Sequence, residues 1–385
     1  MSREVVVVAA GMVPFARRHD GDVDTIAATA INDLLRSSGI DRETVAEAYV
    51  GSAKGGSLVG QRALRFAGLA NGLPVYNVEN ACASSAVAFH LATRSVAMGN
   101  VDVALVAGVD QLSSLGKGAL PVQASEWDGH NGINNPTIYA MRAQRYMHET
   151  GATVEDLAAV SVKARSFAAE NPVAQHRTPT SIEEVLESRT VADPLTLLQC
   201  SSKSDGAAAL VVMERSYAEA HGHAGPLVAA SEVRSGTFSM SARDITQPDI
   251  TIRTADAAYR SAGVAPNDLD VVELHDAFSI AELLYTEELG LCPHGEGPEF
   301  LLSGASSELG TDGTVVNPSG GLIGRGHPIG ATGAAQLVEL FQQLTGTAGP
   351  RQKAGAAIGL AHVTGGGASG FDNGACAVTI LRSTT

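Results

Sequence analysis

The sequence lacks the features that mark several protein classes. Its four cysteines, Cys82, Cys200, Cys292 and Cys376, are widely spaced with no CxxC pair, so neither a zinc centre nor a disulfide framework is indicated. Lysine and arginine form no run and the formal net charge is -15, which argues against general nucleic-acid binding. No apolar run approaches the length that spans a bilayer. We therefore expect a cytoplasmic protein without metal, membrane or nucleic-acid partners.

Aromatic residues are also scarce, at 4%, whereas glycine is abundant with 42 residues and hydrophobic residues make up 44%. This composition suits an α/β protein with tight turns and a large core. A length of 385 residues exceeds a usual single domain and suggests two comparable units.

Cys82 is the first candidate for a catalytic residue. It follows a short apolar segment, 73–78, and precedes a stretch of helical composition, 86–98, so it should lie in a turn between a strand and a helix. Unpaired N–H groups at a helix N-terminus favour the reactive thiolate over the thiol. The alternative is that Cys82 is a small buried hydrophobe.

Three histidines are expected at similar positions. His275 follows the strand-like segment 270–274, His327 lies in a glycine-rich turn before an apolar helix, and His362 follows the strand-like segment 356–361. Parallel α/β sheets place their chemistry at the carboxyl ends of strands, so these residues and Cys82 should gather in one site. A histidine can also end a strand only to bond the backbone, and for His362 this alternative has equal weight.

The motif Gly365-Gly366-Gly367-Ala368-Ser369-Gly370 matches a dinucleotide fingerprint, but only 15 residues follow it. A βαβ unit with a ribose-binding acid does not fit there. We expect instead a turn at which the backbone approaches a ligand.

The order of expected elements repeats along the chain. A strand, helix, strand, reactive turn with helix, and strand occur in the first half and again in the second, which implies two similar α/β lobes. We place them at 1–225 and 226–385. A polar and less regular region at about 113–199 interrupts the first lobe and is interpreted as an insertion that covers the site.

Several motifs carry a family resemblance. They are Asn80-Ala81-Cys82-Ala83-Ser84, Glu273-Leu274-His275-Asp276-Ala277-Phe278-Ser279, and Asn317-Pro318-Ser319-Gly320-Gly321 followed by Gly326-His327-Pro328. In this order over nearly the whole chain, they resemble the thiolase superfamily. The similarity is greatest to the sterol-carrier-protein type, in which His-Asp-x-Phe replaces Asn-Glu-x-Phe. The resemblance implies a thiolase-like fold, with two βαβ-type lobes in a layered α/β/α/β/α core and an inserted loop domain.

The resemblance also implies roles for these residues. Cys82 attacks an acyl-CoA thioester and His327 accepts its proton, while the N–H groups of Cys82, Gly366 and Gly367 bind the oxyanion. His275, with His327, holds the oxygen of a second thioester as its enolate. Coenzyme A is the cosubstrate, no cofactor is tightly bound, and a homodimer or homotetramer is expected.

Two departures leave the reaction open. Most thiolases have a second cysteine two residues before the last Gly-Gly-Gly, where this chain has Val363, and sterol-carrier types often have one where it has Ala277. Neither side chain transfers protons. His362 or a residue of 113–199 is one replacement base. The same residues also fit an aldol lyase with a small OB-fold partner, which retention of Cys82 disfavours, a decarboxylating Cys-His-His condensing enzyme, or an inactive acyl-CoA-binding scaffold.

Overall fold

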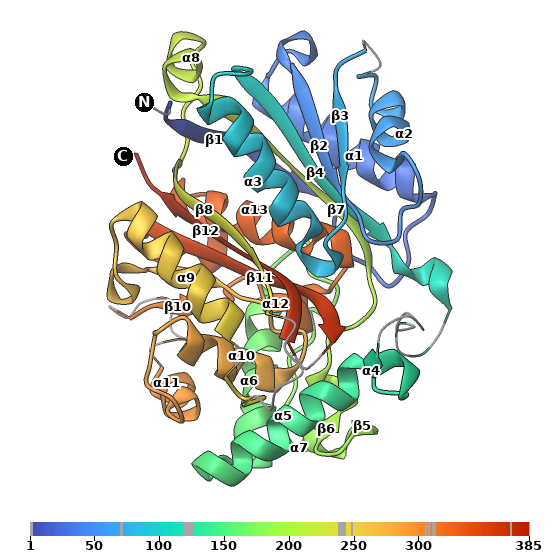
Figure 1. Cartoon of the computed structure of the whole chain (residues 1–385), viewed down its shortest axis with the longest axis vertical. Coiled ribbons are helices and arrows are strands. Elements are labelled where there is room, and N and C mark those ends of the chain that lie inside the picture. Colours follow the sequence, from blue (N-terminus) through green and yellow to red (C-terminus); the bar gives the residue numbers. More distant parts are fainter. Residues whose placement is uncertain are drawn as a thin grey trace.

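The computed structural model describes residues 3–69, 72–116, 118, 120, 127–237, 244–247, 249–304, 306, 309, 313–369 and 372–384. Within these residues, ten strands form one mixed sheet in the order β10-β9-β11-β12-β8-β1-β7-β4-β2-β3 (Figure 1). The strands of the first half are β1 (Val5–Met12), β2 (Glu47–Gly51), β3 (Val75–Val78), β4 (Val103–Gln111) and β7 (Asp205–Glu214). Those of the second half are β8 (Leu227–Ser235), β9 (Val271–Glu273), β10 (Val315–Val316), β11 (Ile358–Ser369) and β12 (Asp372–Arg382).

The two halves have the same topology. If the strands of each half are numbered in chain order, both halves run third, second, fourth, fifth, first. The second strand is parallel to the third and fourth, and the remaining pairs are antiparallel. One residue pair, Val6 with Leu227, joins β1 to β8 across the two halves. The duplication expected from the order of elements is therefore present in the strand order as well.

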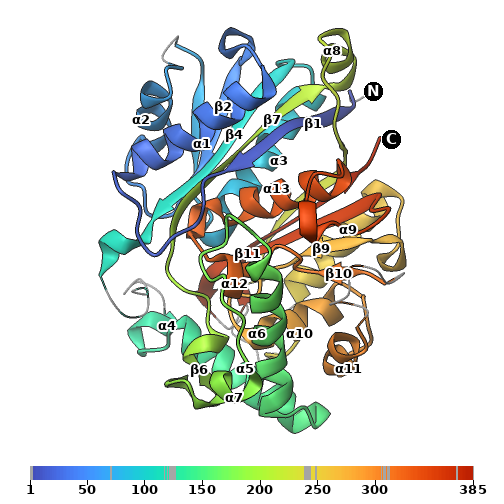
Figure 2. The same cartoon turned by 180° about the vertical axis from the view of Figure 1, so that it is seen from behind.

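Two helices lie between the halves of the sheet, α3 (Ser84–Ala97) and α13 (Thr332–Leu344) (Figure 2). Helix α3 packs on β2 and β4 and also on β8 and β12, while α13 packs on β1 and β7 and also on β9 and β11. The helices approach closely because Gly333 has no side chain: a Cβ there would lie 2.7 Å from the Ala86 Cβ. These two buried helices form the central layer, and each begins beside one of the candidate catalytic residues.

Outer helices cover the remaining faces. Helices α1 (Val23–Ser38) and α2 (Val59–Phe66) pack against each other, with α1 on β1, β4 and β7, and α9 (Asp249–Ala262) packs on β8 and β12. Helix α1 begins where the Asp22 side chain accepts from Thr25 N and ends at Gly39, which has φ 69°. The layers are therefore α/β/α/β/α, which confirms the expected fold class. The shorter helices are α8 (Arg215–Ala220), α10 (Ser279–Glu288), α11 (Gly297–Leu302) and α12 (Gly321–Arg325).

The region 113–199 is more regular than the sequence suggested. It contains α4 (Trp127–His130), α5 (Asn135–Thr150), α6 (Val154–Ala169) and α7 (Ile182–Glu187), with a small antiparallel pair of β5 (Thr190–Ala192) and β6 (Leu195–Thr196). Helix α6 begins with a capping box of Thr153 and Asp156, a signal that sequence inspection missed. It packs on α10 and α12, so the insertion rests on the second half of the molecule.

The prediction of a turn at Gly365 to Gly367 was wrong. Strand β11 continues through these glycines to Ser369, paired with β12, and has an irregularity only between Gly367 and Ser369. His362 therefore lies inside the strand rather than at its end. Glycine is needed there for close packing, because a Cβ at Gly365 would lie 2.1 Å from Asn80 O.

Candidate active site

Cys82 lies in a single 3₁₀ turn, Ala81–Ala83, that leads directly into α3. The turn begins with Ala81 at φ 48°, a left-handed conformation that a residue with a side chain rarely adopts. The Ser84 hydroxyl stabilises it by accepting from Asn80 N at 2.9 Å and donating to Ala81 O at 2.6 Å. Such strain at a candidate nucleophile is typical of functional sites.

His327 has the corresponding place before α13. Its backbone N donates to Ser204 Oγ at 2.9 Å, and a 3₁₀ turn, Ile329–Ala331, separates it from the helix. The Thr332 hydroxyl donates to Pro328 O at 3.3 Å and lies 2.7 Å from His327 Nδ1. Because that hydroxyl proton is already used, Thr332 accepts from Nδ1–H, and this leaves the Nε2 lone pair of His327 unprotonated.

Two hydrogen-bond networks hold these loops in place. Asp110, at the end of β4, accepts from Gly330 N at 2.6 Å and from the N–H groups of Ala53 and Lys54. Ser85 Oγ accepts from Ala334 N at 2.9 Å and so connects the first turn of α3 to that of α13. The histidine loop of the second half is therefore fastened to the first half.

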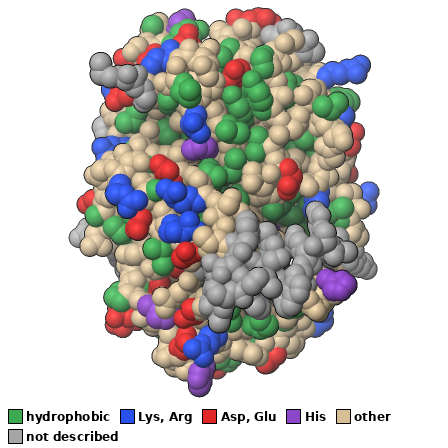
Figure 3. All heavy atoms as spheres, in the orientation of Figure 1, with side chains coloured by type: hydrophobic (Ala, Val, Ile, Leu, Met, Phe, Trp, Pro, Cys, Tyr) green, Lys and Arg blue, Asp and Glu red, His purple; other side chains and the backbone are tan. Residues whose placement is uncertain are grey.

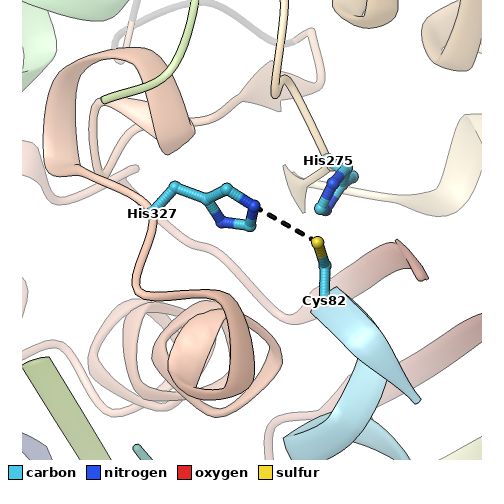
Figure 4. Close-up of side chains that lie close together, drawn as sticks. All are labelled: Cys82, His275 and His327. Carbon is cyan, nitrogen blue, oxygen red and sulfur yellow. Dashed lines mark hydrogen bonds between the residues drawn. The ribbon is translucent and has the colours of Figure 1, made fainter. Parts of the chain in front are cut away.

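These supports bring Cys82 and His327 together. The distance from Cys82 Sγ to His327 Nε2 is 3.3 Å (Figure 4). The two residues are separated by 245 positions, which the fold spans by placing the N-termini of the two central helices side by side. Since Nε2 carries the lone pair, the thiol donates to it.

His275 completes a compact cluster. Its ring lies at 82° to that of His327, with the ring centroids 5.3 Å apart, and one ligand-capable atom from each of Cys82, His275 and His327 lies within 4.8 Å of the others. Figure 4 shows the three side chains pointing toward a common centre from three different segments. His275 Nδ1 is buried and has no hydrogen-bond partner in the described residues.

His362 lies outside that cluster. It is fully buried, its Nε2 is 3.2 Å from Thr251 Oγ1 on α9, and its ring packs on that of Tyr285 with centroids 4.6 Å apart. Its charge, if present, would still lower the pKa of His275. The structure therefore places His362 behind His275, and its role as a replacement base stays a prediction.

The site holds a neutral pair rather than an ion pair. Burial raises the pKa of Cys82 to about 12, against a hydrogen bond from the Gly366 backbone that lowers it. Burial and the charge of Arg325 lower the pKa of His327 to about 3. The expected lowering of the Cys82 pKa by the helix terminus is thus outweighed by removal from water. A neutral imidazole beside a neutral thiol is suited to accepting its proton during attack.

The Gly366 N–H contact also places a backbone donor at the nucleophile, as expected for one oxyanion donor. No comparable contact to Gly367 is present among the described residues, so the role of Gly367 stays a prediction. A Cβ at Gly366 would lie 3.2 Å from the Ala81 Cβ.

The two positions at which a second cysteine was expected are filled by packing residues. Val363 is 1% exposed and belongs to a small apolar cluster with Ala83, Ala86 and Ala377, against which Cys82 itself packs. Ala277 is 7% exposed, within the core of the second half. Neither position offers a group that transfers protons.

Sequence inspection missed the buried charges beneath the His275 loop. Asp276 accepts from Leu322 N at 2.7 Å and Ile323 N at 3.4 Å, and burial, reinforced by the charge of Glu282, raises its pKa well above the usual range. Asn317, at φ 54°, accepts from Leu274 N at 2.8 Å. The His-Asp-x-Phe and Asn-Pro motifs were the available signal for these two residues.

Two fully buried ion pairs support the same loop. Arg325 Nη1 donates to Glu273 Oε2 at 3.0 Å. Lys163 of α6 pairs with Glu282 of α10 and donates to Val316 O at 2.9 Å. These charges are far apart in the sequence, so no local pattern could have indicated them.

Comparison with known proteins agrees with this site. A model described as "Thiolase, N-terminal domain" matches residues 5–216, and one described as "Thiolase C-terminal domain-like" matches 210–373. No helix in the described part of the chain is long and apolar enough to cross a membrane.

Relatives match over nearly the full chain. The benzoylsuccinyl-CoA thiolase subunit BbsB of Thauera aromatica is 44% identical, over 95% of this chain and 96% of that protein. An acetyl-CoA acetyltransferase of Methanothermobacter thermautotrophicus is 37% identical, over 94% and 97%. Sterol carrier protein 2 of Gallus gallus is 35% identical, over 96% of this chain and 71% of the relative.

Solved structures share the fold. One described as an Ltp2-ChsH2(DUF35) aldolase has a TM-score of 0.84 at 24% identity, over 99% of this chain and 98% of that chain. The human mitochondrial 3-ketoacyl-CoA thiolase has a TM-score of 0.75 at 19% identity, over 100% and 99%. With both family domains matched in order and near full-length relatives at 44% and 37% identity, this chain belongs to the thiolase family and is an acyltransferase-type enzyme of that family.

Proposed function

We propose that this protein is a thiolase subunit that forms or cleaves a C–C bond in a β-ketoacyl-CoA through an acyl-Cys82 intermediate. The observation that carries the proposal is the 3.3 Å contact between Cys82 Sγ and the unprotonated Nε2 of His327, with the Gly366 N–H beside the sulfur. A nucleophile within hydrogen-bond reach of a base that a third group orients is the general arrangement for covalent catalysis.

In the first half-reaction His327 takes the thiol proton as Sγ bonds to the thioester carbon. The carbonyl π electrons move to oxygen, where the Gly366 N–H donates to the developing charge. When the carbonyl re-forms, the bond to the CoA sulfur breaks, and the proton on His327 passes to the leaving thiolate. His327 returns to its neutral form, consistent with a pKa lowered to about 3.

The second half-reaction requires removal of an α-proton from another acyl-CoA. Val363 and Ala277 transfer no proton and His362 is bonded to Thr251, so we assign this step to the regenerated His327. His275, with a buried Nδ1 that has no partner among the described residues, then holds the enolate oxygen. The enolate carbon attacks the acyl-Cys82 carbonyl and Sγ leaves.

The relative with 44% identity suggests the substrate class and a partner. It is named as a subunit of a benzoylsuccinyl-CoA thiolase, and the aldolase with the same fold is described with a DUF35 component. We propose that this chain also acts with a second, different protein, and that its β-ketoacyl-CoA carries an aromatic or otherwise bulky acyl group.

Two surface features favour self-association as well. Strand β3 is the sheet edge of the first half, and Tyr76 on it is 45% exposed, with Leu91 and Met98 of α3 37% and 70% exposed. Figure 3 shows hydrophobic side chains gathered over the upper half of this face, where Figure 1 places α3 and β3. We propose that two copies pair there, and light scattering of the wild type beside Tyr76→Lys tests it: a dimer that Tyr76→Lys dissociates is the expected result.

An aldol lyase is the second candidate, favoured by the missing second cysteine at Val363 and Ala277. Aldol cleavage needs no acyl-enzyme, so retention of the Cys82–His327 pair counts against it. A decarboxylating condensing enzyme also uses one cysteine and two histidines, and would require no α-proton acceptor.

Mass spectrometry of the intact protein separates these candidates. The protein is incubated with acetyl-, succinyl- and benzoyl-CoA, alone and with the partner subunit, and compared with Cys82→Ala and with Cys292→Ser as the control thiol variant. An acyl adduct present in the wild type and Cys292→Ser but absent in Cys82→Ala is expected. Turnover of a β-hydroxyacyl-CoA that survives in Cys82→Ala would instead establish the aldol lyase.

A further inference from the structure

The cluster of Cys82, His275 and His327 has a geometry that nucleophilic catalysis alone does not require. One potential metal-binding atom from each residue lies within 4.8 Å of the other two. The two imidazole rings are nearly perpendicular, at 82°, and all three side chains converge on one centre (Figure 4). Two imidazoles and a thiolate are the ligand types that borderline-soft divalent ions prefer.

The distances fit a tetrahedral ion closely. Bond lengths of about 2.3 Å to sulfur and about 2.05 Å to nitrogen give ligand-to-ligand distances of about 3.3 to 3.6 Å in a tetrahedron. The Cys82 Sγ to His327 Nε2 distance is 3.3 Å. The widest pair, at up to 4.8 Å, has to close by about 1.2 Å at most, which rotation of the side chains provides.

The surroundings hold His327 in the required form. Its Nδ1 bonds Thr332 Oγ1 at 2.7 Å, so Nε2 keeps a lone pair aimed at the centre. Hydrogen bonding of the second ring nitrogen is the usual support of a metal-binding histidine. His275 Nδ1 is buried without a hydrogen-bond partner in the described residues, an unsatisfied group that a bound ligand would relieve.

We propose that Cys82, His275 and His327 form a three-ligand site for Zn²⁺, whose binding reversibly inhibits the enzyme. As the Zn–Sγ bond forms, the thiol proton is released to solvent, and the sulfur lone pair that attacks the thioester is engaged by the metal. Water fills the fourth position. Mg²⁺ and Ca²⁺ are not ligands of this site, because they require oxygen donors and the three residues offer none.

Sequence spacing could not indicate this site. The ligands lie 193 and 52 residues apart, whereas structural zinc motifs carry pairs within a few residues. The site exists only because three loops meet at the ends of the central helices.

Cobalt(II) absorption tests the proposal without any acyl-CoA. Co²⁺ is titrated into the metal-free full chain, and tetrahedral visible bands with a thiolate-to-cobalt band in the near ultraviolet are expected at one equivalent. Zn²⁺ should then displace Co²⁺ and abolish the bands. Cys82→Ser and His275→Ala should weaken binding by at least about 100-fold, and Thr332→Val by about 10- to 100-fold through the His327 ring. The control variants Cys200→Ser and Cys292→Ser should bind as the wild type does.

A second measurement uses only the wild-type protein and so does not depend on the variants folding. Zn²⁺ should slow alkylation of Cys82 by N-ethylmaleimide at least about 10-fold, read by peptide mass, and leave Cys292 unaffected. Cobalt bands that persist unchanged in Cys82→Ser, or equal protection of Cys82 and Cys292, would overturn the proposal. Because neither readout involves acyl transfer, the metal site and the proposed thiolase activity can succeed or fail separately.

Discussion

Replacing Gly365 with alanine should disable acylation of Cys82 without removing any catalytic group. A Cβ atom at Gly365 would lie 2.1 Å from Asn80 O and 3.3 Å from the Ala83 Cβ. A carbon-to-oxygen contact needs about 3.3 Å, so β11 and the Cys82 turn must separate by about 1 Å. A displacement of that size costs about 100-fold in rate when it misplaces a reacting group. Overpacking should also lower the free energy of unfolding by about 1 to 3 kcal/mol.

The neighbouring glycine provides a matched control. A Cβ at Gly366 would lie 3.2 Å from the Ala81 Cβ, which a shift of a few tenths of an ångström relieves, and the N–H that faces Cys82 is retained. Gly366→Ala should therefore lose less than about 10-fold in acylation rate. The assay is the time course of the acyl adduct by mass spectrometry, with thermal melting to follow stability. Wild-type acylation in Gly365→Ala, or equal losses in the two variants, would refute the packing argument.

Three further predictions concern the buried polar groups. Thr332→Val should slow acylation about 10-fold by removing the acceptor that orients His327, a loss of about 1.4 kcal/mol; an unchanged rate would mean that another group sets the tautomer. Lys163→Met should destabilise the fold by about 3 to 5 kcal/mol in urea unfolding because Glu282 stays buried and charged, and Lys163→Met/Glu282→Gln should be less destabilised than Lys163→Met alone. His362 has a pKa lowered from 6.5 to about 3 by burial, so its contribution to stability is complete above pH 6.5 and is lost as the pH falls toward 3. Relative to the wild type, His362→Gln should therefore gain about 1.4 kcal/mol per pH unit on acidification between pH 6 and 4, and parallel stability curves would contradict the burial of a neutral ring.

The neutral state of the Cys82–His327 pair also bears on selectivity. A thiol whose pKa is raised to about 12 by burial reacts slowly with general electrophiles, since the thiolate is the nucleophile. Proton transfer to His327 becomes favourable only when a carbonyl carbon is in place to accept the sulfur. This arrangement protects Cys82 from adventitious oxidation while leaving it competent toward a bound thioester.

Much of the fold followed from local sequence. The apolar segments that became β1, β4 and β7 predicted strands within a few residues of their observed ends, because a fully buried strand needs a continuous apolar run. The repeated order of elements predicted the duplication, and the motifs around Cys82, His275 and His327 predicted the family. The glycines of β11 misled us, since glycine marks both turns and close backbone approach, and only the packing of β11 on the Cys82 turn distinguishes the two.

The sequence by itself therefore determined which elements form, which residue types carry chemistry and which family the chain belongs to, because these depend on neighbours along the chain. The tertiary structure alone decided that Cys82 meets His327 at 3.3 Å while His362 turns to Thr251. It also decided the protonation of the pair and the support of the His275 loop by Lys163 and Glu282. Distances, burial and electrostatic surroundings arise from segments more than 100 residues apart, and no local pattern encodes them.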